Sequence, residues 1–170
     1  MKMKTVTLET LAKRQRFRFV MTRWLSVFLA LGLLIWGISP WVRVGININH
    51  SLHGLIYIIV KGADIQRGDD VAFWPPDNPY YHTWFVKIAK GVHGDLVEEK
   101  NRHFYINHEW IGYAKEKTKA GRVLKMGFTG IIPEGYIFVW TPHPDSYDSR
   151  YDDIGLIKDD QVIGRAYRIL

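Results

Sequence analysis

An uncharged apolar run near the N-terminus constrains this chain more than any other feature of its sequence. Sixteen consecutive residues, from Trp24 to Ser39, carry no charge. Largely apolar residues extend the run on both sides, at 19–22 and at 40–42, and the intervening Arg23 can reach the membrane interface with its guanidinium. The apolar span is therefore about 20 residues long, which is what a helix needs to cross the hydrocarbon core.

Two other interpretations of this run are weaker. A cleaved secretory signal has the same order of basic and apolar residues, but no small-x-small cleavage site follows the run, because Gly37–Ser39 leads into Pro40. A core helix is weaker still, because the run is apolar on all sides. Trp24 and Trp41 lie near the ends, where indole rings favour the headgroup layer. We therefore predict an uncleaved transmembrane anchor over residues 24–43.

The basic charge of the chain is confined to the segment before the anchor. The net charge is +6, and residues 1–23 carry seven basic groups and one acidic group, whereas the other 147 residues carry sixteen of each. Basic segments remain on the cytoplasmic side of a membrane, which predicts a cytoplasmic tail over 1–23 and an external domain over 44–170. A duplex-binding protein would carry its basic charge on the folded part, so we expect no nucleic-acid partner.

The remainder of the chain has the pattern of an antiparallel β protein. Short runs rich in β-branched and aromatic residues alternate with Gly, Pro, Asn and Asp, and no long 3.6-residue period follows the anchor. The short link Lys100–Arg102 predicts a hairpin, and Ile132–Tyr136 predicts a turn into a strand. We predict a mostly β, irregular antiparallel fold after one N-terminal transmembrane helix. The expected strands are Leu55–Lys61, Asp70–Trp74, Thr83–Lys90, Asp95–Glu99, His103–Ile106, Ile111–Ala114, Tyr136–Thr141 and Gln161–Leu170.

Four segments of this β region carry the polar residues that could support chemistry. The sequence has no cysteine, which excludes a disulfide, a cysteine-based zinc site and a thiol nucleophile. Ser51, which lies in the first segment, is by itself no more than a turn or capping serine. The segments are Asn47–His53, Arg67–Phe73, Thr83–Asp95 and Pro144–Tyr151, which leads toward Val162–Ala166.

Lys87, in the third segment, is an unusual residue for its surroundings. By strand alternation it shares a face with Phe85 and Ala89. A lysine in a half-buried strand usually lies on the solvent face. If Lys87 is buried instead, desolvation disfavours its ammonium form and lowers its pKa from about 10.4. A neutral amine of that kind is what a general base requires.

Taken in this order, the four segments resemble the type I signal peptidase (leader peptidase) family, from about Ser51 to the C-terminus and with the anchor placed as in the family. They are most similar to the conjugative-transfer peptidases of the TraF type, which mature pilin precursors. Those have P-D-S-[FWY]-D-S-R-Y where general signal peptidases have G-D-N-R-D-N-S-x-D-S-R. The resemblance implies a signal-peptidase-like fold. The matching motifs are R-G-D-x-V-x-F at 67–73, V-K-x-A-x-G-x-x-G-D at 86–95, I-P-x-G-Y-x-F-V at 132–139, D-S-x-D-S-R-Y at 145–151 and V-I-G-R-A at 162–166.

The resemblance implies a role for five residues. It makes Ser51 the nucleophile and Lys87 the general base of a Ser–Lys dyad, a known variant of the serine-protease arrangement. Ser146 matches the hydroxyl that orients the lysine. Asp148 and Arg150 match an ion pair that holds the last loop. No cofactor and no metal are implied.

The segment around Ser51 matches the family pattern less closely than the other segments do. A tetrahedral oxyanion needs hydrogen-bond donors, and from its position we expect the side-chain amide of Asn49 to act with the backbone N–H of Ser51. The family commonly has Pro shortly after the nucleophile, whereas here Ser51-Leu52 is followed by His53 and Gly54.

Other side chains compete for the same roles. Ser146 and Ser149 are rival serines, although they stand where the family has supporting residues. A Ser–His dyad would use His50 or His53, but adjacent residues of an extended segment point apart, which counts against His50. A metal site at His103 and His108 is weaker, because the spacing does not suit one helix face and no carboxylate pattern accompanies it beyond Glu109.

These observations lead to an expected function. We expect a single-pass enzyme of the inner (cytoplasmic) membrane with a periplasmic serine peptidase domain. Its substrate would be an exported precursor, the pilin precursor of a conjugative transfer or type IV secretion system, cleaved through an acyl-enzyme on Ser51. Its other partners would be the membrane and proteins of that apparatus. The alternative is a non-catalytic, membrane-anchored β domain that scaffolds such an apparatus. A self-cleaving repressor of the same fold is weaker, because those proteins are soluble and have a DNA-binding domain.

Overall fold

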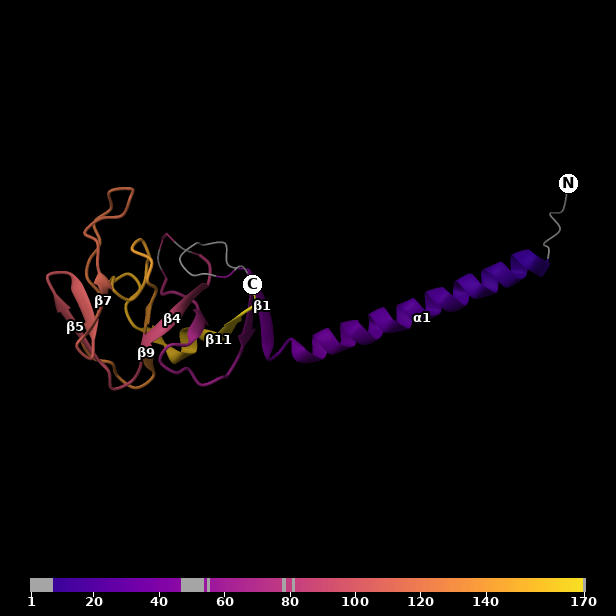
Figure 1. Cartoon of the computed structure of the whole chain (residues 1–170), viewed down its shortest axis with the longest axis horizontal. Coiled ribbons are helices and arrows are strands. Elements are labelled where there is room, and N and C mark those ends of the chain that lie inside the picture. Colours follow the sequence, from indigo (N-terminus) through magenta and orange to yellow (C-terminus); the bar gives the residue numbers. More distant parts are fainter. Residues whose placement is uncertain (1–7, 47–53, 55, 78, 81, 170) are drawn as a thin grey trace. The chain divides into compact units, whose positions relative to one another are not determined.

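The computed structural model describes residues 8–46, 54, 56–77, 79–80 and 82–169 (Figure 1). The chain separates into two compact units, Met1–Pro40 and Trp41–Leu170. The first unit holds a single helix, and the second holds all of the described strands.

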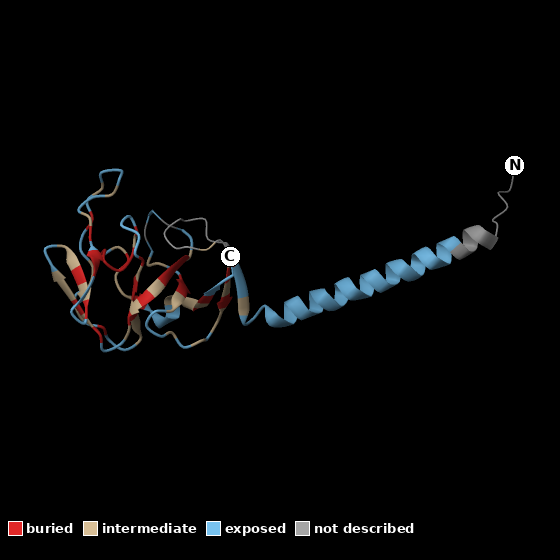
Figure 2. Ribbon diagram, viewed as in Figure 1, coloured by how far each residue is buried: buried red, intermediate tan, exposed pale blue. Residues whose placement is uncertain are grey.

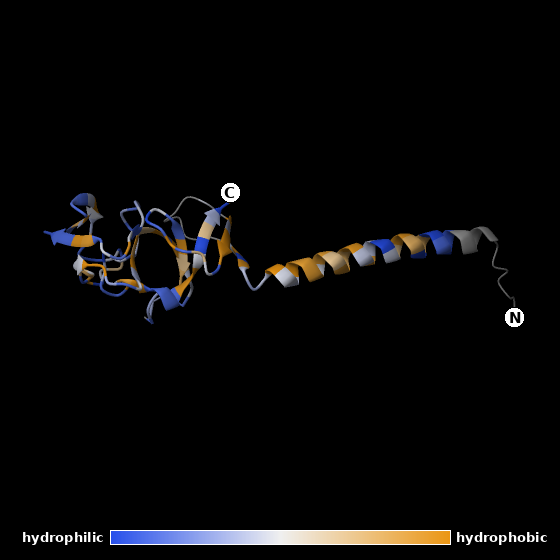
Figure 3. Ribbon diagram, turned by 90° about the horizontal axis from the view of Figure 1, so that it is seen from below, coloured by the Kyte–Doolittle hydropathy of each residue, from blue (hydrophilic) through white to orange (hydrophobic). Residues whose placement is uncertain are grey.

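The helix α1 spans Leu8–Ile38. Its segment Lys13–Ile38 is 26 residues long and apolar enough to cross a membrane, and all of its residues are exposed (Figure 2). At 1.5 Å per residue that segment measures about 40 Å, which exceeds the hydrocarbon core of about 30 Å. In Figure 3 the C-terminal part of the helix is mainly orange and the turns near its N-terminal end are mainly blue, as expected where the basic residues lie. A membrane anchor and an N-terminal signal sequence share these properties.

The helix boundaries differ from the predicted anchor at both ends. The helix begins in the basic tail, at Leu8, because straight-chain residues such as Lys, Arg and Gln have high helix propensity. It ends at Ile38, just before Pro40, whose ring does not allow a helix to continue. Val42 and Arg43, which the sequence placed in the anchor, belong to the first strand instead.

A seven-stranded antiparallel sheet forms the larger part of the second unit. Its strand order is β1-β2-β11-β3-β4-β9-β10, so β4 lies near the centre with β3 on one side and β9 on the other. The strands are β1 (Val42–Ile46), β2 (Ile56–Val60), β3 (Asp70–Phe73), β4 (Phe85–Gly91), β9 (Tyr136–Trp140), β10 (Ile157–Lys158) and β11 (Val162–Arg168).

A smaller antiparallel sheet has the order β7-β6-β5-β8. Two-residue turns connect its first three strands, and the turn residues Asn101, Arg102, Asn107 and His108 all have positive φ. This is the backbone that a type I′ hairpin requires, and asparagine tolerates it better than most residues. The strands are β5 (Leu96–Lys100), β6 (His103–Ile106), β7 (Glu109–Tyr113) and β8 (Gly130–Ile131).

The predicted mostly β antiparallel architecture is confirmed. All eight predicted strand segments overlap a strand, and the predicted hairpin between β5 and β6 is present. Three strands were not predicted. β1 directly follows the apolar helix, and β8 and β10 have two residues each, which is too short to show a period.

The core of the large sheet lies on both faces of β4. Phe85 and Ala89 pack in one hydrophobic cluster with residues of β3 and β9. Val86 packs in another cluster with residues of β2 and β11. A strand that is covered on both faces leaves no solvent side for the residue between Val86 and Ile88, which is Lys87.

The glycine of the V-I-G-R-A motif is explained by a close contact between strands. Gly164 lies at a bulge where β11 changes register against β3. A Cβ atom at this position would lie 2.2 Å from the carbonyl oxygen of Val60. Any larger residue would therefore push β11 away from β2.

Candidate active site

Lys87 lies in the middle of β4 and is buried, with 5% of its surface exposed. Its Nζ donates a hydrogen bond of 2.9 Å to Oγ of Ser146. Burial lowers the pKa of Lys87 from 10.5 to about 8; the charge of Asp148 raises it and that of Arg150 lowers it further, both less than burial does. The amine is therefore much closer to neutrality at physiological pH than that of an exposed lysine.

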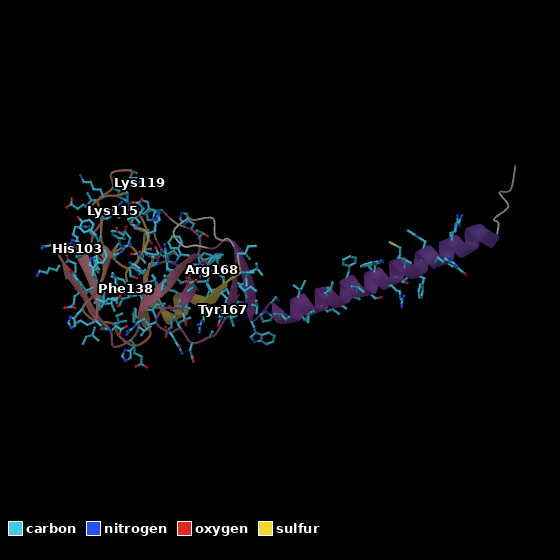
Figure 4. All side chains as sticks on the ribbon, in the orientation of Figure 1. His103, Lys115, Lys119, Phe138, Tyr167 and Arg168 are labelled. Carbon is cyan, nitrogen blue, oxygen red and sulfur yellow. The ribbon has the colours of Figure 1, made fainter. Side chains whose placement is uncertain are left out.

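Ser146 belongs to a loop that follows β9, and its side chain is also buried. Its backbone N–H donates a 3.0 Å hydrogen bond to the carbonyl of His143, which closes a turn. The preceding Asp145 pairs with Lys115 and, at 3.0 Å, with Lys119, and these contacts lower its pKa to about 2. Both lysines lie on the long connection between β7 and β8 (Figure 4). Those ion pairs therefore connect the segment just before Ser146 to a second element of the fold.

Asp148 and Arg150 form a buried bidentate ion pair. Nε and Nη2 of Arg150 each donate a 2.8 Å hydrogen bond, one to each carboxylate oxygen. Asp148 also accepts a 3.4 Å hydrogen bond from the backbone N–H of Thr141, and Arg150 donates a 3.1 Å bond to the carbonyl of Tyr113. A planar guanidinium matched to a carboxylate in this way fixes geometry as well as charge.

This arrangement can remove a proton from a nearby acid. A lysine whose neutral form is accessible near pH 8 is a competent general base. The Ser146 hydroxyl holds the amine in place, and the loop that carries the hydroxyl is itself held by the Asp148–Arg150 pair. Among the described residues, no group of three His, Asp or Glu side chains is placed to hold a metal ion.

Comparison with known proteins identifies the family. Residues 16–170 match the family model described as signal peptidase, peptidase S26.

The chain belongs to the signal peptidase family S26.

Membership of this family supports a serine peptidase activity. The chain is also similar to the conjugal transfer protein TraF of Agrobacterium fabrum, with 27% identity over 153 residues that cover 79% of this chain and 85% of that protein. Among solved structures, a signal peptidase I from Enterococcus faecalis V583 matches with a TM-score of 0.41 and 28% identity, over 61% of this chain and 97% of that one.

Ion pairs connect the signal peptidase motifs to one another. Arg67 of R-G-D contacts Asp95, the last residue of the lysine motif, and Asp95 also accepts a 2.8 Å hydrogen bond from the side chain of Asn107. Asp69 pairs at 2.7 Å with Arg165 of V-I-G-R-A. These motifs therefore hold together the strands around β4, a contribution that sequence spacing alone does not reveal.

The structure brings four of the six predicted site residues into one cluster. Lys87, Ser146, Asp148 and Arg150 lie together in the buried region between β4 and the loop after β9. The other two, Ser51 and Asn49, lie outside the described residues, as do the rival bases His50 and His53. Their roles remain predictions.

The rival side chains among the described residues have other partners. The Ser149 hydroxyl accepts a 2.9 Å hydrogen bond from the backbone N–H of Val139 and lies within the fold. His103 accepts a 3.2 Å hydrogen bond from the indole of Trp110, and His108 pairs at 2.7 Å with Glu98.

One buried polar residue near Lys87 had no signal in the sequence. Thr141, directly after β9, is completely buried, and its hydroxyl has no hydrogen-bond partner within the part of the chain that the structure describes. It directly follows Trp140, which pairs with Ile88, the residue after Lys87.

Proposed function

We propose that this signal peptidase family member is a membrane-anchored serine endopeptidase that uses a dyad of Ser51 and Lys87. Its substrate is an exported precursor protein, the pilin precursor of a conjugative transfer or type IV secretion system. α1 anchors the chain in the inner membrane with its N-terminus in the cytoplasm, and residues 44–170 act in the periplasm.

The observation that carries this proposal is the state of Lys87. Its amine is buried, has a pKa lowered to about 8 and donates to a buried serine hydroxyl. A structural lysine gains nothing from such a site, because taking a charge out of water is unfavourable. A base gains the neutral form that it needs near physiological pH.

In the proposed acylation step, the neutral amine of Lys87 accepts the proton of the Ser51 hydroxyl while Oγ attacks the carbonyl carbon of the scissile bond. The negative charge moves to the carbonyl oxygen, where the backbone N–H of Ser51 and the side-chain amide of Asn49 stabilise it. The ammonium then gives its proton to the leaving amine as the C–N bond breaks, which leaves an ester on Ser51.

In the second half of the reaction, Lys87 is again neutral and activates the attacking molecule. Water gives the free acid, and an amine gives a new amide. The ester bond to Ser51 breaks, and Oγ recovers its proton from the lysine.

The substrate class follows from similarity rather than from geometry. The Agrobacterium relative is a conjugal transfer protein, and the D-S-x-D-S-R-Y motif at 145–151 is of the type found in conjugative peptidases. The uncharged run Trp24–Ser39, most of which lies in α1, and the basic residues before it support the proposed membrane orientation.

The test is processing of a candidate pilin precursor by the full-length protein in cells. We expect the precursor to be shortened by the wild type and to remain full length with Ser51→Ala or Lys87→Met. Lys90→Met is the matched control, since Lys90 lies on the same strand but pairs with the exposed Glu109 at 3.3 Å. Normal processing in both dyad variants would reject the dyad and favour the scaffold function, to which the altered loop after Ser51 also points.

A further inference from the structure

Gly54 has a backbone conformation that residues other than glycine rarely adopt. It lies three residues after Ser51 and two residues before β2, in the stretch where the family commonly has proline. Its φ is +131°, whereas the ring of proline holds φ at about −65°. A side chain disfavours a positive φ because its Cβ atom meets the backbone. The departure from the family pattern therefore comes with a backbone conformation that proline cannot adopt.

Two side chains pack directly against Gly54. A Cβ atom at this position would lie 2.7 Å from Cδ of Arg168 and 2.9 Å from the hydroxyl oxygen of Tyr57. Non-bonded carbon atoms are at their best separation at about 3.5–4.0 Å, so these side chains leave no room for a methyl group. Three residues of chain reach at most about 11 Å, and Ser51 therefore lies within that distance of the contact.

Both side chains belong to strands of the large sheet, which holds them in place. Tyr57 of β2 is completely buried, so its ring cannot move aside, and it lies opposite Arg168, the last residue of β11 (Figure 4). The backbone N–H of Ile169 donates a 2.9 Å hydrogen bond to the carbonyl of Ile56, which continues the pairing beyond Arg168. Asp70 of β3 attracts the guanidinium: burial raises the pKa of Asp70, and the charge of Arg168 lowers it.

We propose that Gly54 and Arg168 are positioning residues whose contact fixes the segment that carries Ser51, so that the serine hydroxyl meets the Lys87 amine. This inference rests on the proposed Ser–Lys function. The stem of Arg168 gives the chain a surface to pack on, and Gly54 is small enough to reach that surface. A nucleophile needs such support, because a displacement of about 1 Å can lower a rate about 100-fold.

The test compares variants of the full-length protein in detergent. Gly54→Ala adds the methyl group for which there is no room, and Arg168→Ala removes the stem. Arg168→Met removes the charge but keeps most of the stem. Gly62→Ala is the matched control, since Gly62 also has a positive φ, of +69°, and a Cβ atom there would have nothing within 4 Å.

Three quantities are measured: the melting temperature, kcat and KM on the precursor, and the pKa of a thiol introduced by Ser51→Cys. The chain has no cysteine of its own, so this thiol is its only one, and the pH dependence of its alkylation gives its pKa. A neighbouring ammonium lowers a thiol pKa from its usual value of about 8.5. The thiol therefore reports whether position 51 lies beside Lys87, without any need for peptidase activity.

For Gly54→Ala and Arg168→Ala we expect kcat to fall about 10- to 100-fold, with a smaller change in KM. Arg168→Met should restore most of kcat, and Gly62→Ala should leave it at the wild-type value. In the Ser51→Cys protein, Gly54→Ala and Arg168→Ala should raise the thiol pKa toward the value found with Lys87→Met. A purely structural role would lower the melting temperature and leave both kcat and the thiol pKa of the folded protein unchanged.

Two results would overturn the inference. One is wild-type kcat with an unchanged thiol pKa in Gly54→Ala and Arg168→Ala; the other is an equal loss of kcat in Gly62→Ala, which would reflect backbone strain rather than the contact. Failure of the proposed function looks different, because the wild type would then leave the precursor intact. The thiol pKa would still report whether the contact places position 51 beside Lys87.

Discussion

Lys87 Nζ and Ser146 Oγ are joined by a 2.9 Å hydrogen bond that spans 59 positions of the sequence. Both side chains are buried, so the bond is shielded from competing water. It connects the centre of β4 to the loop after β9, and it gives the lysine side chain one preferred position. The functional consequences of this arrangement can be tested separately.

The first prediction separates the two neighbouring buried serines. Ser146→Ala removes the hydroxyl to which Lys87 donates, and we expect kcat/KM for precursor cleavage to fall about 10- to 100-fold. Because a buried donor loses its acceptor, the substitution should also cost about 1–3 kcal/mol of stability. Ser149→Ala instead leaves the buried N–H of Val139 without its acceptor, which should cost about 1–3 kcal/mol of stability. Kinetics and thermal melts of both variants give the comparison. Ser149→Ala should leave kcat/KM of the folded protein close to the wild-type value, and an equal fall in kcat/KM for the two substitutions would contradict separate roles.

The second prediction concerns the pH dependence of the rate. A general base must be neutral, and with a pKa of about 8 roughly one tenth of Lys87 is neutral at pH 7. We expect kcat/KM to rise about tenfold per pH unit below pH 8 and to level off above it. An acid limb near pH 6.5 would indicate a histidine base, and one near pH 10 would indicate an exposed lysine.

The third prediction is a pH-dependent gain in stability on removing the lysine charge. The pKa of Lys87 is about 8 in the folded protein and 10.5 for a lysine in water, so the unfolded chain binds the proton more tightly. Burial of the charge therefore lowers the free energy of unfolding by about 3 kcal/mol below pH 8. This loss of stability diminishes as the pH rises from 8 to 10.5. We expect Lys87→Met to unfold at a higher temperature than the wild type at pH 7.

Thermal melts at pH 10 test the predicted direction of this pH dependence. The advantage of Lys87→Met should shrink there, because pH 10 is close to the pKa of 10.5 in the unfolded chain, so releasing the proton on folding costs little. An advantage that grows between pH 7 and pH 10 would mean that the lysine is not desolvated in the folded protein. Lys90→Met, on the same strand, should show no comparable trend.

The fourth prediction concerns membrane orientation and uses the absence of cysteine from the chain. A cysteine introduced at position 2 or at the exposed Thr129 is the only thiol of the protein. We expect Thr129→Cys to react with a membrane-impermeant maleimide in cells whose outer membrane is opened. Lys2→Cys should react only after the inner membrane is dissolved. The reverse pattern would contradict the proposed topology.

Much of the fold could be predicted from local patterns. The uncharged run at 24–39 marked the helix, and the alternation of apolar residues marked every strand of four or more residues except β1. β8 and β10 exist only because a neighbouring strand pairs with them, and two residues carry no period. Pairing partners of this kind depend on the whole sheet and cannot be found in a local window.

Part of the candidate site could be predicted from the sequence. That part came from the family motifs rather than from the secondary-structure propensities of the residues. Strand alternation left open whether Lys87 is exposed or buried, and burial follows from clusters on both faces of β4. The contact between Lys87 and Ser146, like the pairs Arg67–Asp95 and Asp69–Arg165, joins segments far apart in the chain. The unsatisfied Thr141 hydroxyl is visible only when burial and register are known together.

Mass spectrometry of the acid-quenched reaction with precursor tests the Ser51–Lys87 dyad most directly. Trypsin cleaves after Arg43 and Lys61, so Ser51 is the only serine or threonine in its peptide, and the rivals Ser146 and Ser149 share the separate peptide 126–150. We expect a covalent acyl adduct on the peptide 44–61 in the wild type, formed much more slowly in Lys87→Met and absent in Ser51→Ala. An adduct on 126–150, or one that forms at the wild-type rate without the Lys87 amine, would contradict the dyad.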